Sequence, residues 1–145
     1  MATVTAICTS SKKGIVKRAV SQAVFEKDFG IVDDAHAGKW HRQVSLLAAE
    51  SIDMVKEKLP TLKDGAFAEN IISKGLDIST IKVGDQLQIG THIILEITQI
   101  GKECHNDGCA IKKATGECIM PKEGLFAKVI EGGTAKAGDT ISPIN

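Results

Sequence analysis

The sequence has no tyrosine, a single tryptophan and no excess of charge of either sign. Aromatic residues make up 3% of the 145 residues, so the chain lacks the stacking platforms with which many proteins bind single-stranded nucleic acid. Lysine plus arginine and aspartate plus glutamate number 18 each, so the basic footprint of a nucleic-acid-binding protein is also absent. We therefore expect no nucleic acid among the partners of this chain.

Long hydrophobic runs are missing as well. No stretch approaches the roughly 20 apolar residues of a membrane span, and residues 1–7 alternate like a β-strand instead of forming the apolar centre of a signal peptide. We therefore expect a cytoplasmic protein without a membrane partner. The four cysteines would be reduced in that compartment, which makes them candidates for metal binding or sulfur chemistry rather than for disulfides.

Short alternating apolar segments dominate the rest of the chain and predict an α+β fold that is mostly β. The clearest of them is Ile93 to Ile100. Gly84-Asp85 and Gly138-Asp139 each precede such a segment, and glycine in these places suits the corners of a curved sheet. One main helix is predicted over residues 48–59, because apolar residues recur on one face there and Pro60 ends the pattern. We expect residues 1–145 to form one domain, built on a curved, antiparallel, barrel-like sheet.

A cysteine-rich loop follows directly after the strand-like segment that ends at Ile100. Cys104 and Cys109 lie in this loop close to glycines, and loops held by a rigid scaffold often carry the chemistry of a protein. A nearby cation such as Lys102 favours the reactive thiolate. Cys8 instead lies inside the first alternating segment and is predicted to be a small, buried and inert core residue.

The same loop has a second interpretation. Cys104, His105, Cys109 and Cys118 have the residue types of a zinc site with three cysteines and one histidine. Adjacent cysteine and histidine ligands tend to diverge, however, and the short C-x₂-C spacing of structural zinc sites is absent. A zinc-stapled, non-catalytic module therefore stands as an alternative.

A polar loop is predicted around His36, Lys39, His41 and Arg42, because the glycine and the alternation that follow argue against a helix. Cations on a loop suit an anionic ligand such as phosphate, to which arginine offers a two-pronged fork. The alternative is that the two histidines hydrogen-bond to the backbone and order the loop.

Glu69 and Asn70 are the polar members of an otherwise apolar segment, Gly65 to Ile71. If they are buried, they must find hydrogen-bond partners. They either line a pocket or satisfy the backbone of a buried loop, and the spacing leaves both open.

Three stretches taken together resemble the MOSC domain, the C-terminal domain of molybdenum cofactor sulfurases, which also occurs in short stand-alone proteins. The stretches are Asp34 to Leu47, Gly65 to Ile71 and Gln99 to His105, and the tail from Gly116 to Phe126 is similar to small stand-alone members. The family commonly has glycine where this chain has Asp33.

The resemblance implies a β-barrel-like fold with a pocket for the molybdenum cofactor, molybdopterin. A phosphate on the pterin needs cations around it. The candidate cofactor-binding residues are His36, Lys39, His41, Arg42, Glu69, Asn70 and Lys102.

The family also implies a cysteine that carries sulfur as a persulfide or, in oxidoreductase relatives, ligates molybdenum. The Gly-x-x-Cys pattern after the strand matches Cys104, and the Cys-x-Ile pattern followed by Thr-Gly matches Cys109, so both are candidates for the catalytic thiol and for the metal ligand. The leading hypothesis is a molybdenum-cofactor-binding accessory protein that carries or transfers sulfur between a donor and a recipient molybdoenzyme. The alternative is a small, cysteine-ligated molybdenum-cofactor oxidoreductase that acts on N-oxygenated substrates.

Overall fold

The structure is a computed structural model that describes residues 2–101 and 123–144. The predicted loop residues Lys102, Cys104, His105, Cys109 and Cys118 lie outside the described residues.

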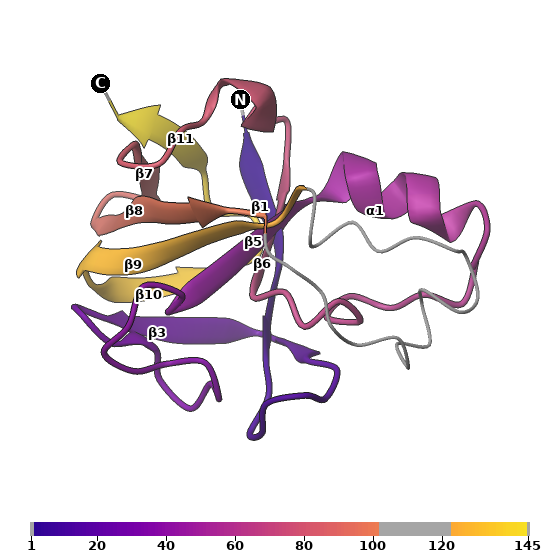
Figure 1. Cartoon of the computed structure of the whole chain (residues 1–145), viewed down its shortest axis with the longest axis horizontal. Coiled ribbons are helices and arrows are strands. Elements are labelled where there is room, and N and C mark those ends of the chain that lie inside the picture. The colour runs from indigo at the N-terminus through magenta and orange to yellow at the C-terminus, as the bar shows by residue number, and fades with distance from the viewer. Residues whose placement is uncertain (1, 102–122, 145) are drawn as a thin grey trace.

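Among the elements of residues 2–101 and 123–144, most are strands, and the α-helix over Ala49–Lys56 accompanies them (Figure 1). In chain order the elements are β1 (Thr3–Thr9), β2 (Arg18–Val20), β3 (Gln22–Glu26), β4 (Gly30–Ile31), β5 (Val44–Ala48), α1 (Ala49–Lys56), β6 (Ile71–Lys74), the 3₁₀-helix η1 (Ile78–Thr80), β7 (Gln86–Ile89), β8 (Ile93–Ile100), β9 (Leu125–Glu131), β10 (Gly133–Lys136) and β11 (Ile141–Ile144).

Eight of these strands form one sheet in the order β11-β7-β8-β9-β5-β6-β1-β2, and β10-β3-β4 form a second sheet. The pairs are antiparallel except for β5 and β6, which run parallel. The large sheet curls, because Val4 in β1 exchanges backbone hydrogen bonds of 2.7 and 2.8 Å with Gly138 and Asp139, just before the edge strand β11. The predicted mostly β, curved and mainly antiparallel fold is confirmed.

Similar turns at Gly84-Asp85 and Gly138-Asp139 precede strands β7 and β11, as the sequence predicts. In each turn the aspartate carboxylate accepts a hydrogen bond of 2.9 Å from a lysine backbone N–H three residues earlier, at Lys82 and at Lys136. Gly84 and Gly138 have φ angles of 96° and 97°, a conformation that glycine adopts without steric cost. The sequence K-x-G-D thus encodes both corners.

The buried apolar side chains divide into a main core within the curled sheet and a smaller core that includes residues of α1. Alternation along β8 buries Ile93, Leu95 and Ile97 in the main core. On α1, Ile52 and Val55 are buried against the sheet. Each such side chain contributes roughly 1.5–3 kcal/mol relative to an exposed position.

Two segments differ from their predicted form. The α-helix ends at Lys56, although Leu59 still donates a backbone hydrogen bond of 3.0 Å to Val55, and Pro60 cannot extend it. The apolar pattern of Phe67 to Ile72 predicts a strand or extended segment, but residues 67–70 lie in a turn and irregular chain, and β6 begins only at Ile71. The carboxylate of Glu69 holds this turn by accepting hydrogen bonds from the backbone N–H groups of Gly65 and Phe67.

Candidate functional site: a cationic cleft beside Trp40

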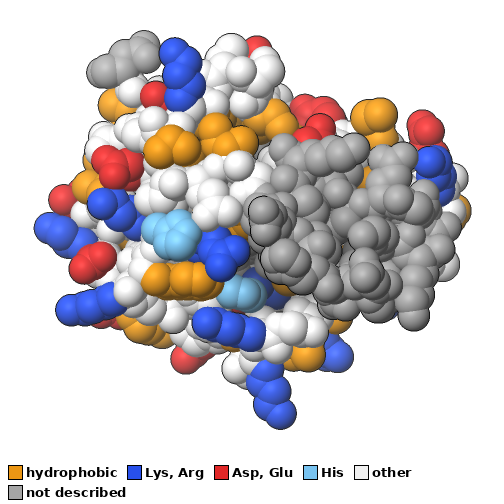
Figure 2. Space-filling model, in the orientation of Figure 1, with side chains coloured by type: hydrophobic (Ala, Val, Ile, Leu, Met, Phe, Trp, Pro, Cys, Tyr) orange, Lys and Arg blue, Asp and Glu red, His pale blue; other side chains and the backbone are white. Residues whose placement is uncertain are grey.

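A cleft of about 310 Å³ lies where five segments converge. Its lining comes from the loops before β2 and β5, the turn before β6, and β5 and β9. The lining residues are Lys13, His36, Trp40, Arg42, Ser45, Phe67, Ala68, Asn70 and Phe126. This volume is at the lower end of the range for small-molecule sites. Figure 2 shows histidine and lysine or arginine side chains gathered around apolar side chains near the middle of one face.

Arg42 is held in the cleft by aromatic rings. Its guanidinium carbon lies 4.8 Å from the ring centroid of Trp40 and 5.7 Å from that of Phe126. Lys13 Nζ lies 4.7 Å from the Trp40 ring as well. Cation–π attraction places a cation without consuming its N–H groups, so these contacts leave the hydrogen-bond donors of both side chains available.

The Nε atom of Arg42 is buried and has no hydrogen-bond partner among the described residues. An unsatisfied buried donor costs about 1–3 kcal/mol. The ion pairs in residues 2–101 and 123–144 are Lys17–Asp34 and Lys128–Glu96, so no carboxylate in that part of the chain neutralises Arg42 or Lys13. The cleft therefore combines two cations with a donor that lacks an acceptor, which is the arrangement that an anionic ligand completes.

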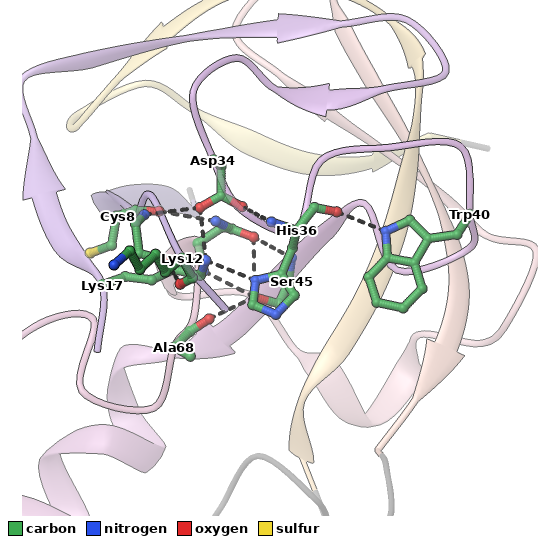
Figure 3. A network of polar contacts seen from close by, with 10 residues as sticks. Cys8, Lys12, Lys17, Asp34, His36, Trp40, Ser45 and Ala68 are labelled. Atoms are coloured by element: carbon green, nitrogen blue, oxygen red, sulfur yellow. Dashed lines mark hydrogen bonds and ion pairs between the residues drawn. The ribbon is translucent and has the colours of Figure 1, made fainter. Parts of the chain in front are cut away.

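Behind the cleft lies a fully buried ion pair (Figure 3). Lys17 Nζ lies 2.7 Å from Asp34 Oδ1, and both side chains have 0% exposure. Lys17 Nζ also lies 3.1 Å from Ser10 Oγ and 2.9 Å from His36 Nδ1. Asp34 in turn accepts backbone hydrogen bonds of 3.1 Å from Ser10 and from His36. This network ties the loop that carries His36 to the end of β1.

Asp33, where the family commonly has glycine, has a φ of 71°. This is the left-handed region, which aspartate enters more readily than most residues. Asp33 therefore adopts a backbone conformation that glycine reaches without steric cost, directly before Asp34.

The predicted polar loop is ordered by Trp40 and by both histidines. Trp40 Nε1 donates a hydrogen bond of 2.7 Å to the carbonyl oxygen of His36, and the two rings stack with centroids 6.4 Å apart. His41 is exposed, its Nε2 lies 2.9 Å from Gln99 Oε1, and its carbonyl accepts a hydrogen bond from Thr98 Oγ1. His36 and Arg42 line the cleft, whereas His41 and the exposed Lys39 do not.

Asn70 lines the cleft and also joins the strands beneath it. The side chain is fully buried. Its Nδ2 donates to the carbonyl of Cys8 at 3.0 Å, and its Oδ1 accepts from the backbone N–H of Ser45 at 3.0 Å. Because Cys8 is in β1 and Ser45 in β5, Asn70 fixes the floor of the cleft. Both alternatives that the sequence left open for Asn70 apply.

Glu69 holds the turn that carries two other lining residues. Its carboxylate is fully buried and accepts backbone hydrogen bonds from Gly65 at 3.0 Å and from Phe67 at 2.9 Å. Burial raises the pKa of Glu69 above its ordinary value, and these N–H donors oppose that rise. Glu69 is not among the lining residues of the cleft, but it positions Phe67 and Ala68, which are. The carboxylate replaces the strand bonds that residues 65–70 would otherwise need.

Gly65 allows this turn to pack against the chain near Lys17. It has a φ of 89°, and an added Cβ would lie 2.1 Å from the carbonyl oxygen of Lys17. Its own carbonyl accepts a hydrogen bond of 2.8 Å from the Lys17 N–H. A side chain at position 65 would therefore separate Lys17 from the turn.

Cys8 is fully buried, as predicted. Burial, followed by the nearby charge of Glu69, raises the pKa of its thiol from 9.0 to about 12. A neutral thiol is a poor nucleophile, so Cys8 is inert near neutral pH. In the described residues, no group of three or more His, Cys, Asp or Glu side chains is placed to hold a metal ion.

Six lining residues were not predicted as site residues, and neither was Lys17 behind the cleft; the six are Lys13, Trp40, Ser45, Phe67, Ala68 and Phe126. The single tryptophan between two histidines and an arginine was a signal that could have found Trp40. Lys17 stands in a stretch without a clear period, so no local pattern marks it.

The MOSC domain model matches residues 33–142 of this sequence. The chain belongs to the MOSC domain family. The crystal structure of the YuaD protein from Bacillus subtilis is similar, with a TM-score of 0.77 and 17% identity over 97% of this chain and 94% of that one. YiiM from Geobacillus stearothermophilus has a TM-score of 0.72 and 17% identity over 100% of this chain and 76% of the other.

YiiM from Escherichia coli shares the MOSC fold too, with a TM-score of 0.68 and 16% identity over 99% of this chain and 70% of that one. A search of curated proteins gives no significant match. At these identities the similarity establishes the fold. In the described part of the chain, no helix has the length and apolar character needed to cross a membrane.

Proposed function

We propose that this MOSC protein binds the molybdenum cofactor in the cationic cleft and carries or transfers sulfur through Cys104 or Cys109. The observation that supports the proposal most is Arg42, whose buried Nε has no partner in the described residues although two aromatic rings hold the guanidinium in place. An anionic group on a ligand would supply the missing acceptor.

The described residues suit the chemistry of this cofactor. Molybdopterin has a pterin ring system and a phosphate. Arg42 and Lys13 would hold the phosphate, and Trp40 and Phe126 offer apolar surface to the ring system. His36 and Asn70 add polar atoms to the wall and floor. When bound, the cofactor would supply a molybdenum–sulfur centre, while the chain binds it and shields it from water.

Sulfur chemistry requires a reactive thiol, and Cys8, the cysteine within residues 2–101 and 123–144, is buried and inert. Cys104 and Cys109 remain the proposed carriers and metal ligands, with Lys102 favouring the thiolate. A thiolate takes the terminal sulfur of a persulfide donor, and the donor leaves as a thiolate. The partners are then a sulfur donor and a recipient molybdoenzyme, in the cytoplasm, where thiols stay reduced. In this proposal residues 1–145 act as one MOSC domain.

The test is elemental and pterin analysis of the protein purified from a host that makes the cofactor. We expect molybdenum and pterin in similar amounts, and loss of bound pterin in Arg42→Ala. Exposed Arg18, the chain's other arginine, lies outside the cleft lining, so Arg18→Ala is the matched control and should retain pterin. Stoichiometric zinc without molybdenum or pterin would refute the proposal in favour of a zinc-stapled module.

The sulfur carrier is tested separately by loading the protein with a persulfide donor and locating the added sulfur by mass spectrometry. We expect Cys104→Ser or Cys109→Ser to abolish loading, and Cys8→Ala to leave it unchanged. If both serine variants load sulfur like the parent protein, the proposed role of Cys104 and Cys109 as sulfur carriers is wrong. If the loaded protein instead reduces N-oxygenated compounds with an external electron donor, the oxidoreductase alternative replaces the accessory role.

A further inference from the structure

We infer that buried Lys17 is a positioning residue that holds His36 in one neutral tautomer, with the hydrogen on Nε2. The consequence is that His36 acts in the cleft as a hydrogen-bond donor and not as a base. The hydrogens and acceptors of the network behind the cleft match one another only in this tautomer (Figure 3).

The ammonium group of Lys17 has three N–H donors and cannot accept a hydrogen bond. Its Nζ has three partners, which are Asp34 Oδ1 at 2.7 Å, His36 Nδ1 at 2.9 Å and Ser10 Oγ at 3.1 Å. The Ser10 hydroxyl donates its own hydrogen to the carbonyl of Lys12 at 3.0 Å, so its oxygen is free to accept from Lys17. Each ammonium hydrogen therefore has one acceptor.

The contact with Lys17 decides which nitrogen of the His36 ring carries the hydrogen. Because the ammonium can only donate, Nδ1 of His36 must accept with its lone pair. A hydrogen on Nδ1 would point at the Lys17 hydrogens and would leave one of them unpaired in a site with 0% side-chain exposure. A neutral imidazole with an occupied Nδ1 lone pair carries its hydrogen on Nε2.

The backbone of His36 is held by hydrogen bonds at both its N–H and its carbonyl group. The His36 N–H donates to Asp34 Oδ2 at 3.1 Å, and the His36 carbonyl accepts from Trp40 Nε1 at 2.7 Å. These bonds hold the main chain of His36 and so fix the base of its ring beside Lys17. Asp34 has a double function, since one oxygen pairs with Lys17 and the other orients the backbone of His36.

The charges around the His36 ring suit a neutral hydrogen-bond donor at this position. Lys13 and Arg42 line the same cleft as His36, so the positive charge needed for an anion is already present. A neutral ring adds a directed N–H donor without adding a further cation beside Lys17. This use of the donor rests on the proposed function, whereas the assignment of the tautomer does not.

The experiment is nitrogen NMR of the full-length, ligand-free protein labelled with ¹⁵N-histidine at neutral pH. His36→Asn identifies the His36 signals by their loss. We expect Nδ1 at the shift of an unprotonated, hydrogen-bonded nitrogen and Nε2 at that of a protonated one. In Lys17→Met, both nitrogens should move toward averaged shifts, whereas Lys13→Met should leave them unchanged.

Removing Lys17 alone leaves the buried Asp34 carboxylate without its cation, so the double variant Lys17→Met with Asp34→Asn supplies a folded comparison without a buried unpaired charge. A protonated Nδ1 in the wild-type protein would overturn the inference. So would unchanged His36 shifts in the folded double variant. If the tautomer is as expected but Arg42→Ala retains pterin like the parent, the proposed function fails while this inference stands.

Discussion

The ammonium of Lys17 and the Nε atom of Arg42 are both shielded from water, yet they meet opposite surroundings. Lys17 has three acceptors, one of them the carboxylate of Asp34. Arg42 Nε has none in the described residues, and aromatic rings hold its guanidinium. A buried cation that the protein satisfies is part of the fold, whereas one that it leaves incomplete is available to a ligand.

The first test removes the carboxylate partner of Lys17, so that its buried charge, like that of Arg42, has no ion pair in the described residues. Asp34→Ala removes the carboxylate and leaves a buried charge unpaired, so we expect the free energy of unfolding in urea to fall by about 3–5 kcal/mol. Glu96→Ala is the matched control, because the Lys128–Glu96 pair is 3.4 Å long and its side chains are 41% and 30% exposed. Removing such a surface pair should cost at most about 1 kcal/mol. Equal losses in the two variants would show that burial does not distinguish the pairs.

A second test extends the comparison to Glu69, a buried carboxyl group that forms no ion pair within the described part of the chain. Burial raises the pKa of Glu69 above its ordinary value of 4.5. The folded protein therefore holds this proton more tightly than the unfolded chain. The stabilisation is complete below pH 4.5 and is lost as the pH rises through the folded pKa.

Relative to Glu69→Gln, the wild-type protein should accordingly gain unfolding free energy as the pH falls from about 7 toward the ordinary pKa of glutamate. Urea titrations of both proteins at several pH values measure this difference. A difference that does not vary with pH would mean that folding leaves the proton affinity of Glu69 unchanged.

The smallest expected effect is that of Arg42 on the fold. Arg42→Ala loses cation–π contacts worth about 0.5–1 kcal/mol each at partly exposed sites. It also removes a buried donor that has no partner in the described chain, which offsets the loss. We expect the free energy of unfolding in urea to change by at most about 1 kcal/mol. A loss as large as that of Asp34→Ala would show that Arg42 is part of the fold after all.

The alternating segments predicted the curved β fold because their pattern is local. Gly84 and Gly138 are followed by aspartates that close each turn, so the corners too can be inferred from adjacent residues. Arg42, His36 and Asn70 were predicted as site residues, and all three line the cleft.

Lys17 could not be predicted because its role depends on residues far along the chain. Asp34 and His36 lie 17 and 19 residues away, and the turn at Gly65 packs against its backbone. Phe126 reaches Arg42 only through the pairing of β9 with β5. Of the two alternatives for Glu69, the structure shows the one in which it satisfies the backbone of a buried loop. Its two carboxylate oxygens accept hydrogen bonds from the N–H groups of Gly65 and Phe67.

The central claim is that the cleft binds an anionic ligand through Arg42, and equilibrium binding of molybdopterin tests it most directly. Hydrogen bonds to charged groups contribute about 1.5–3 kcal/mol, so Arg42→Ala should bind roughly 10- to 150-fold more weakly than the wild-type protein. Arg42→Lys should restore part of the affinity, since lysine keeps the charge but not the fork. Arg18→Ala should bind like the wild type. Wild-type affinity in a folded Arg42→Ala protein would contradict the account.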